Sequence, residues 1–482
     1  MKKILSVICI LLTLSLLVSC KEGKNEDDYD HAADFTKEDG KIFEDVPDER
    51  YAGYTFRVLN AKVGSSASHM DTETIDGNNL NEALFRRNLN VEERLGIVIE
   101  EVYDTPEQVF DISHAACLSG EDTYSAICNT SDKMATMAVC GYLVTDIYLS
   151  GMDMDKPWWN VYAIDSAAVD SKRFFFYGDL QLSYYDAHSM VGVNMDMIED
   201  IDGIQNPYTL VDTGKWTFDA MLSMMSMADV DLDGNGVRTY EDRYGTAIDK
   251  SSVLPLIVGC NSFISGRDEY GLPTMTCFGD GKLYDVFKMI SDSLYERNDF
   301  VYDTVKNEAD GMSAAAMFKS GYSLFYLTNV GALANLRDMD YEFAVLPMPK
   351  YSENQKNHVS FLSGKDASAI GVMMTCRNFK RASNIIENLA AESHRKGGLR
   401  ECYIDTVLSF KYVNDEKSRK NLSVVISSGV FDPAEIYGWG GVCDRLTELV
   451  GNSDEYASTL ASVRLKALSA ISETVEEVNK QK

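Results

Sequence analysis

The sequence predicts an α/β protein in which layers of helices cover β-sheets. From residue 51 onward, segments rich in β-branched and aromatic residues alternate with segments of helical periodicity. The chain has 482 residues, 45% hydrophobic and 25% charged, which is enough for roughly two or three domains with large apolar cores. Because no repeat with a period of about 20–50 residues is visible, solenoids and propellers are disfavoured.

The first elements of this alternation are well marked. Residues 54–59, Tyr-Thr-Phe-Arg-Val-Leu, have the composition of a strand. A helix is predicted over 80–95, where leucine and valine recur at helical spacing, and Asn79 with Glu82 can form a capping box at its start. Further strands are predicted at 97–102, 124–128 and 173–177, and a further helix at 382–392.

The amino terminus indicates export and a lipid anchor. A positively charged start, Met-Lys-Lys, precedes an apolar run over 4–18, which is too short to span a bilayer of about 30 Å as a helix but suits a signal peptide. Leu-Val-Ser-Cys at 17–20 resembles the lipobox of bacterial lipoproteins, so residues 1–19 are predicted to be a cleaved signal and Cys20 to carry the lipid. An ordinary secretory signal with a chance cysteine is the alternative. The prediction places the protein outside the cytoplasm, anchored to the cell membrane.

The chain is strongly acidic. Asp and Glu number 75 against 45 Lys and Arg, which gives a net charge of −30. Because such a charge repels phosphate backbones, nucleic acid is disfavoured as a partner.

Residues 20–50 are polar and acidic with few apolar side chains, and we expect them to form a flexible tether between the membrane and the folded part of the chain.

An aspartate-rich loop over 231–242 has the spacing of a calcium-binding loop. Oxygen-bearing side chains stand at its first, third and fifth positions, glycine at the sixth, and an acid at the twelfth. Ca²⁺ binds about six to eight oxygens at about 2.3–2.6 Å, and this spacing wraps them around one point. Since the last position is Asp rather than the usual Glu, a turn without metal is the alternative. The predicted ligands of a structural Ca²⁺ are Asp231, Asp233, Asn235, Val237 through its carbonyl, and Asp242.

Four further segments carry a family resemblance. They are Lys-Pro-Trp-Trp-Asn at 156–160, Gly-Lys-Trp-Thr-Phe-Asp at 214–219, Met-Phe-Lys-Ser-Gly-Tyr at 317–322 and Phe-Ala-Val-Leu-Pro-Met-Pro-Lys-Tyr at 343–351. In this order and spacing, and together with the aspartate-rich loop, they resemble the extracellular solute-binding proteins of bacterial ABC transporters, in particular the lipoprotein members. The resemblance spans most of the mature chain.

The resemblance implies the two-lobed α/β fold of type II periplasmic binding proteins, with strands that cross between the lobes at a hinge. Two crossings are expected, near 177–186 and 358–367. A monomer of this kind would close over a small solute and deliver it to the permease subunits of an ABC transporter. The implied first lobe comprises 51–180 and 360–417, and the implied second lobe comprises 185–357 and 418–482.

A carbohydrate is the expected solute. Aromatic rings cover the apolar face of a pyranose, and carboxylates or amides bind its hydroxyls. For Trp158 and Trp159 packing between the lobes is the alternative, and for Tyr185 and Trp439 burial in a core. The candidate ligand-binding residues, chosen at strand ends, in a Pro-Trp-Trp segment and in a glycine-rich turn, are Asn60, Trp158, Trp159, Asp179, Tyr184, Tyr185, Asp186, Asn329, Tyr437 and Trp439.

We expect no enzymatic activity. The sequence contains no GxSxG, P-loop or GxGxxG motif, and its six histidines are scattered. Two other functions remain open, namely a lipoprotein that senses a ligand or adheres to a surface, and a surface glycoside hydrolase that uses two carboxylates. The solute could likewise be a peptide or a polyol rather than a sugar.

Overall fold

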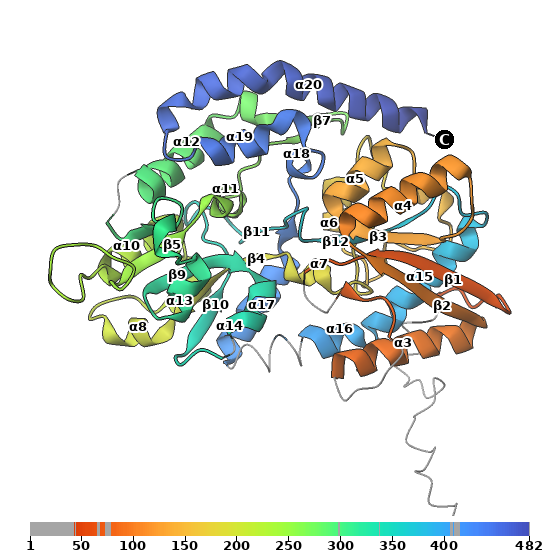
Figure 1. Ribbon diagram of the computed structural model, residues 1–482, viewed down its shortest axis with the longest axis horizontal. Helices are drawn as coiled ribbons and strands as arrows, with labels where there is room; N and C mark the ends of the chain where they lie inside the picture. The colour runs from red at the N-terminus through yellow and green to blue at the C-terminus, as the bar shows by residue number, and fades with distance from the viewer. Residues whose placement is uncertain are drawn as a thin grey trace, which may run out of the picture. The chain divides into compact units, whose positions relative to one another are not determined.

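Figure 1 shows the computed structural model, which describes residues 43, 45–64, 68–72, 79–296, 299–336, 338–404, 408 and 415–481. Asp45–Lys482 forms one compact unit. The predicted signal peptide, the lipidation site Cys20 and the tether as far as residue 42 lie outside the described residues. Within the described ranges, no helix combines the length and the apolar character that a membrane span requires.

The first large sheet has four strands: β1 (Tyr54–Ala61), β2 (Ile97–Asp104), β3 (Ala126–Thr130) and β12 (Ser368–Val372). Their order is β12-β3-β1-β2, in which β1 pairs in parallel with β2 and β3, and β12 runs antiparallel to β3. Parallel neighbours need crossover helices, and these cover both faces of the sheet in Figure 1. One face carries α4 (Pro106–Ser119) and α5 (Ser131–Val139), and the other carries α3 (Asn79–Leu95), α15 (Phe379–His394) and α16 (Leu399–Glu401).

Most of the elements predicted in this region are confirmed. The strand at 54–59, the helix at 80–95 and the strand at 97–102 lie within β1, α3 and β2, and α15 contains the predicted helix at 382–392. β3 begins two residues later than predicted. The predicted strand at 173–177 is wrong, since these residues form only one bridge, between Phe176 and Ile370. Its aromatic side chains are buried, so the composition there reflects burial rather than a strand ladder.

The second large sheet has five strands: β4 (Ser189–Asn194), β5 (Tyr244–Ile248), β8 (Val301–Asp303), β9 (Ser323–Asn329) and β10 (Phe343–Leu346). Their order is β10-β4-β9-β5-β8, with β4 antiparallel to both neighbours and β5 parallel to both. The helices of this part are α8 (Met195–Asp200), α9 (Pro207–Asp212), α10 (Phe218–Ala228), α11 (Val253–Gly259), α12 (Gly281–Ile290), α13 (Ala314–Lys319), α14 (Leu333–Leu336) and α17 (Glu416–Ser427).

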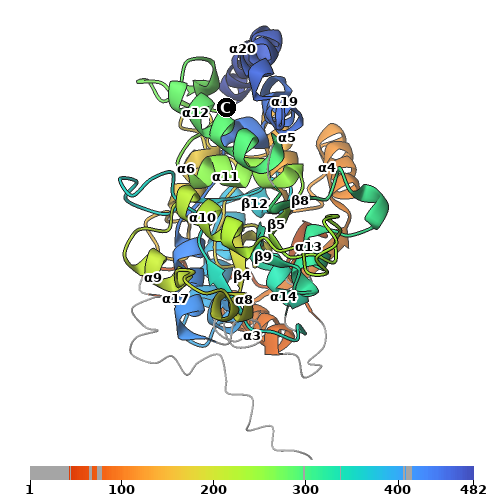
Figure 2. The ribbon, with the colours of Figure 1, turned by 90° about the vertical axis from the view of Figure 1, so that its left-hand side faces the viewer.

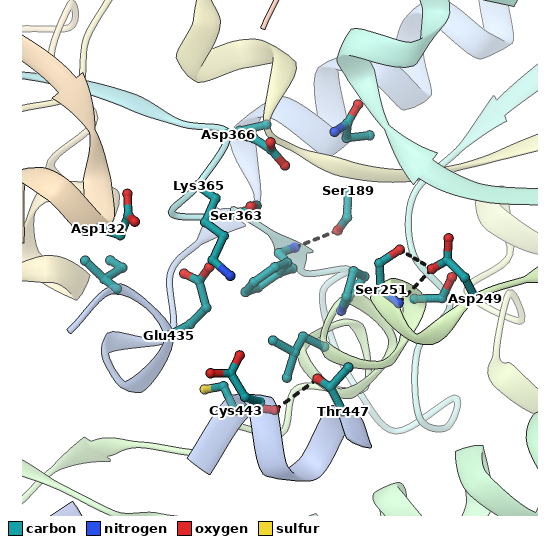
Figure 3. Close-up of a pocket in the computed structure, with 18 of the residues that line it drawn as sticks. Asp132, Ser189, Asp249, Ser251, Ser363, Lys365, Asp366, Glu435, Cys443 and Thr447 are labelled. Atoms are coloured by element: carbon teal, nitrogen blue, oxygen red, sulfur yellow. Dashed lines mark hydrogen bonds between the residues drawn. The ribbon is translucent and has the colours of Figure 1, made fainter. Parts of the chain in front are cut away.

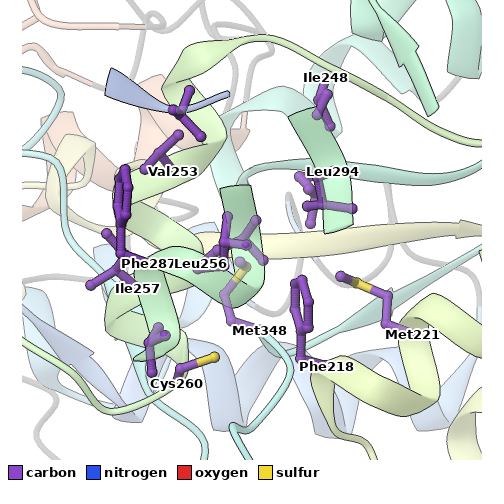
Figure 4. Close-up of a cluster of buried hydrophobic side chains, with 14 of the residues drawn as sticks. Phe218, Met221, Ile248, Val253, Leu256, Ile257, Cys260, Phe287, Leu294 and Met348 are labelled. Atoms are coloured by element: carbon purple, nitrogen blue, oxygen red, sulfur yellow. The ribbon is translucent and has the colours of Figure 1, made fainter. Parts of the chain in front are cut away.

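The core beside the second sheet forms where α10, α11 and α12 meet. Figure 4 shows Phe218, Leu256 and Phe287, one from each of these helices, and all three are fully buried. Trp216, just before α10, is also buried, and its Nε1 donates a hydrogen bond to Pro347 O at 2.8 Å. The apolar faces of these helices therefore hold the second sheet and the segment after β10 in one packed layer.

Short segments carry the chain from one sheet to the other. α7 (Ser183–Asp186) precedes β4. β11 (Ser360–Phe361) lies between β10 and β12 in the sequence and pairs in parallel with β13 (Gly429–Val430), which follows α17. The lobe boundaries given by the sequence analysis stay a prediction.

A carboxy-terminal group of helices completes the described chain. It comprises α18 (Pro433–Ile436), the short 3₁₀ helix η10 (Trp439–Gly441), α19 (Val442–Leu449) and α20 (Tyr456–Lys480). In Figure 2, α19 and α20 lie at the same end of the molecule as α12. Another short helix, α6 (Val161–Ala167), contacts α18.

Candidate functional site

Elements of both large sheets line a pocket of about 770 Å³. α5 contributes Asp132 from the side of the first sheet, and β9 contributes residues 326–329 from the second. Residues 363–366, between β11 and β12, form part of the wall, and residues 434–438 of α18 and the turn after it form another part. Figure 3 shows these walls with several polar side chains around the pocket.

The end of β3 positions Asp132 in this pocket. β3 ends at Thr130, whose Oγ1 donates to Asp132 Oδ1 at 2.5 Å. Ser131 begins α5, and its N and Oγ both donate to Ala367 O, at 3.0 and 2.9 Å. Asp132 N donates to Gly364 O at 3.3 Å. These bonds hold the first turn of α5 against the segment that leads to β12.

β9 brings a tyrosine and an asparagine to the opposite wall. Tyr326 is half-buried and lines the pocket, and its ring stacks on that of Phe318 with centroids 5.5 Å apart and planes at 27°. Asn329 follows at the end of the strand, where its Oδ1 accepts from Ala332 N at 3.2 Å. Since Phe318 supports one side of the Tyr326 ring, that ring is held as a fixed aromatic surface.

Glu435 of α18 links the pocket wall to the crossing segment. Its two carboxylate oxygens accept from Gly364 N at 3.2 and 3.0 Å. Burial raises the pKa of Glu435 to about 8, the Gly364 N–H opposes this rise, and the nearby Asp132 adds to it. Lys365, labelled beside Glu435 in Figure 3, also lowers the pKa of this carboxyl. At neutral pH Glu435 is therefore a largely protonated group that can donate a hydrogen bond.

The raised pKa of Glu435 predicts that stability falls as the pH rises. A carboxyl with a folded-state pKa of about 8 and an ordinary value of 4.5 holds its proton more tightly in the folded chain. The stabilisation of the folded state by this proton is fully present below about pH 4.5 and is lost as the pH rises towards 8. We expect Glu435→Gln to reduce the decrease in melting temperature between pH 6 and pH 9, whereas Glu353→Gln, at an exposed position, should leave it unchanged. Equal pH slopes for the native chain and Glu435→Gln would contradict the assignment.

Tyr437 contributes a second tyrosine to the pocket. Its ring stacks on Trp439 with centroids 5.2 Å apart and planes at 11°. Its Oη donates to Ala167 O, at the end of α6, at 2.9 Å. Tyr437 and Tyr326 are therefore supported in the same way, since each lines the pocket and packs against a second aromatic ring. Of the ligand-binding residues predicted from the sequence, Asn329 and Tyr437 lie in this pocket.

The aromatic residues of α7 lie elsewhere than predicted. Tyr184, Tyr185 and Asp186 are buried together with Asp179. Tyr185 Oη donates to the Asp179 carboxylate, which also binds His394 Nδ1. None of these four predicted residues is among the described residues that line the pocket. Their hydrogen-bonding groups have partners inside the fold, so the pocket gives no support for ligand contact by these residues, and that contact stays a prediction.

Three further candidates are also buried away from the pocket. Trp158 and Trp159 are 1% and 5% exposed, and Trp159 Nε1 donates to Glu387 Oε2 of α15 at 2.9 Å. Asn60, at the end of β1, is buried and donates through Nδ2 to Glu101 Oε1 at 2.5 Å. Both tryptophans pack beside the first sheet, Trp158 near His394 of α15 and Trp159 near Phe176, so the structure does not show the alternative of packing between the lobes. Asn60 likewise fixes the end of the first sheet.

Trp439 is a core residue, not a side chain presented from a loop. It is 1% exposed and belongs to the large hydrophobic core of the second part of the chain. Its Nε1 donates to Thr474 Oγ1 of α20 at 3.0 Å. The glycine-rich turn around it was the reason to expect an exposed ring. One of its glycines, Gly440, instead allows the turn to approach Ala467 of α20 closely, and the indole beside it is buried.

Several pocket residues were missed by sequence reasoning. Asp132 lies four residues after the end of the strand predicted at 124–128, and its closeness to a strand end was a signal that could have been used. Tyr326 lies within the hydrophobic sequence of β9. The pattern of apolar and polar residues in this strand does not indicate that the Tyr326 ring lines a pocket. Glu435 and Lys365 come together only through tertiary structure, since 70 residues separate them.

The aspartate-rich loop brings three carboxylates together. One oxygen each from Asp231, Asp233 and Asp242 lies within 4.8 Å of the others, a separation at which they could hold a cation. Asp231 also accepts from Gly234 N and Gly236 N, at 2.8 and 2.7 Å. The backbone thus preorganises the loop, and both the calcium site and the simple turn remain compatible with it.

Comparisons with solved structures identify the architecture. A sugar transporter from Rhizobium etli, in an open conformation, aligns over 89% of this chain and 100% of its own with 11% identity and a TM-score of 0.57. MalE from Listeria monocytogenes in complex with maltose aligns over 89% and 99% with 11% identity and a TM-score of 0.54. An ABC substrate-binding protein from the same organism, in complex with cycloalternan, aligns over 89% and 98% with 13% identity and a TM-score of 0.51. The chain has the two-lobed fold of the solute-binding proteins. No protein-family model and no curated protein sequence matches it.

This solute-binding fold confirms the predicted fold class. The first sheet belongs to one lobe, the second sheet to the other, and the pocket has walls from both. The crossing segment that contains β11 supplies residues 363–366 of the wall, so a movement of the lobes would change the pocket.

Proposed function

We propose that the chain is a lipid-anchored, extracytoplasmic solute-binding protein that captures a neutral oligosaccharide between its lobes. It then delivers the sugar to an ABC permease and performs no chemistry on it. The observation that carries the proposal is the pocket of about 770 Å³ with walls from both lobes. Its volume lies within the range of about 300–1,000 Å³ that is typical of small-molecule sites.

The pocket lining suits a polyhydroxylated ligand. Hydroxyl groups can donate to and accept from sugar hydroxyls, which avoids burying an unpaired polar group. Acidic residues outnumber basic ones in the lining, which disfavours an anionic ligand. The lysines are Lys133 and Lys365, and the acids are Asp132, Asp249, Asp366, Glu435 and Asp444. The hydroxyl-bearing residues of the lining, apart from the tyrosines, are Thr136, Ser189, Ser251, Ser252, Ser313, Thr328, Ser363 and Thr447.

Two tyrosines supply the aromatic surfaces that pyranose rings need. Tyr326 and Tyr437 each have one aromatic neighbour behind them, Phe318 and Trp439. Rigid rings lose little conformational entropy when a ligand stacks on them. A pyranose unit occupies about 180 Å³ at the packing density of organic crystals, so the pocket volume of about 770 Å³ corresponds to about four units. This supports an oligosaccharide rather than a monosaccharide.

The sequence supports the proposed anchor, and the fold supports the proposed permease. The signal peptide and Cys20 support a lipid anchor outside the cytoplasm. The structures similar to this chain are described as a sugar transporter, an ABC substrate-binding protein and a MalE, which supports a role in carbohydrate uptake.

A thermal-shift screen tests the proposed function. The chain from residue 21 onward is mixed with mono- and oligosaccharides, with short peptides and polyols as the competing ligand classes. A ligand at about 100 times its dissociation constant stabilises the folded state by about 2.7 kcal/mol, which is detectable. We expect neutral tri- or tetrasaccharides to give the largest shifts and to be recovered intact. A shift with peptides alone, or cleavage of the sugar, would contradict the proposal.

We also propose a structural calcium ion in the aspartate-rich loop. The convergence of Asp231, Asp233 and Asp242 supports it. We expect a chelator to lower the melting temperature by several degrees, with Ca²⁺ restoring it, and Asp231→Ala to abolish this response. Asp268→Ala is the matched control, because Asp268 caps a comparable turn through Tyr270 N at 2.9 Å but belongs to a different loop. If the chelator has no effect on the native chain, the loop is a turn without metal.

A further inference from the structure

Helix α20 lies behind two different walls of the pocket. In Figure 1 it runs along one end of the molecule, from above α12 in the second lobe to above α5 in the first. The same α5 presents Asp132 to the pocket from its first turn, and η10 directly follows the wall residue Tyr437. A single helix thus touches elements that carry pocket residues from both lobes.

The contact with η10 is close and specific. Gly440 has φ +65°, a left-handed conformation that favours glycine. A Cβ at this position would lie 2.6 Å from Ala467 Cα of α20, so a side chain there would displace the helix. The hydrogen bond from Trp439 Nε1 to Thr474 Oγ1 fixes the same turn about two helical turns further along α20. α20 therefore fixes the turn at 439–441, which lies just after the pocket residue Tyr437.

The first half of α20 is fixed to the second lobe. The ring of Tyr456 packs against Phe287 and Tyr284 of α12, with centroids 5.2 and 5.1 Å apart. Leu460 and Val463 on the same side of the helix are buried. These apolar contacts make this half a permanent part of the second lobe.

The last turn of α20 is fixed to the first lobe by polar contacts. Gln481 Nε2 donates to Ala138 O and Val139 O at the end of α5, at 2.5 and 3.3 Å. Lys172 Nζ donates to Val478 O at 2.9 Å. Val478 itself is fully buried, so the last turn makes an apolar contact in addition to these hydrogen bonds.

A strained turn of the first lobe meets this end of the helix. Asn479 Nδ2 donates to Asp170 Oδ2 at 2.8 Å. Asp170 and Ser171 have φ +49° and +61°, a conformation that non-glycine residues rarely adopt and that surrounding contacts must hold in place. The docking of α20 supplies such a contact.

A parallel contact lies at the end of α6. Arg267 Nη2, in the short strand β6 (Gly266–Arg267), donates to Asp165 O and Ala168 O, both at 2.6 Å. Tyr437 Oη donates to Ala167 O between them. The carbonyl groups at the end of α6 therefore bind donors from β6 and from the pocket wall.

We propose that the last turn of α20 is a latch that couples closure of the pocket to ligand binding. Lys172, Asn479 and Gln481 are positioning residues that do not line the pocket. Gln481 holds the end of α5 against α20, and the other two join α20 to the turn at 170–172. The inference rests on the proposed function for its ligand, while the latch itself belongs to the fold. Both ligand and latch favour the closed arrangement, so each strengthens the other by the same coupling free energy.

The test removes side chains that form the hydrogen bonds of the latch and changes no residue that lines the pocket. The triple variant Lys172→Met, Asn479→Ala, Gln481→Ala is compared with Lys480→Met, whose ammonium group pairs with Glu476 and Glu477 of the same helix at 3.0 and 2.8 Å. X-ray scattering of the chain from residue 21 onward, without ligand, gives the radius of gyration. We expect the triple variant to have a larger radius than the native chain, and Lys480→Met to match the native chain.

Ligand dissociation provides the second readout, with maltotetraose as the probe. We expect about tenfold faster dissociation from the triple variant, with little change for Lys480→Met. Unchanged scattering curves together with unchanged dissociation would overturn the latch. If maltotetraose binds neither chain, the scattering comparison still decides on the latch, whereas the proposed function is decided by the ligand screen.

Discussion

Replacing Trp439 with alanine is expected to lower the free energy of unfolding by about 3–5 kcal/mol, in the absence of any ligand. The indole is 1% exposed, so its removal leaves a large cavity between η10 and α20. It also deprives Thr474 Oγ1 of the Nε1 donor. Chemical denaturation of the purified chain measures the change directly.

The control for this substitution lies on the same helix. Leu465 of α20 is 83% exposed, and Leu465→Ala should change the free energy of unfolding by less than about 0.5 kcal/mol. If Trp439→Ala kept its stability and lost only affinity for saccharide, the ring would contact the ligand, as the glycine-rich sequence around it first suggested.

Substitution of Tyr326 by leucine is expected to weaken oligosaccharide binding by about ten- to thirtyfold, or about 1.4–2 kcal/mol. Leucine keeps the apolar contact with Phe318 but removes the aromatic surface on which a pyranose would stack. Calorimetric titration with the tightest ligand from the screen measures the loss. The melting temperature without ligand should fall only slightly, since Tyr326 is half-buried.

A matched tyrosine separates a local effect from a general one. Tyr270 is 77% exposed and does not belong to the pocket lining, so Tyr270→Leu should leave the dissociation constant unchanged. Equal affinities for Tyr326→Leu and the native chain would remove Tyr326 from the binding site and would weaken the case for stacking in this pocket.

Local sequence patterns predicted the fold well where each element carries its own signal. The helix over 80–95 and the strands beside it have a periodicity that acts within a few positions, and these elements occur as predicted. The helix begins at Asn79 itself, which was predicted to be its cap. The strand predicted at 173–177 from its aromatic residues was wrong, because burial and strand formation favour the same residue types. Only the tertiary structure separates these two causes.

The pocket was harder to predict than the fold. Residue types that suit a sugar also suit a core, so Trp158, Trp159, Tyr184, Tyr185 and Trp439 could not be distinguished from packing residues by sequence alone. Asn329 and Tyr437 were found because a strand end and a glycine-rich turn placed them. Glu435 gave no local signal, since its burial and its raised pKa arise from contacts with the crossing segment and α5.

The most direct test of the account is a crystal structure of the chain with the oligosaccharide that binds most tightly in the screen. The account predicts that the sugar lies between the lobes, with one pyranose ring on Tyr326, another on Tyr437, and hydroxyl groups bound by residues 363–366 or by Asp132. A sugar bound outside this pocket, with both tyrosine rings free, would contradict it.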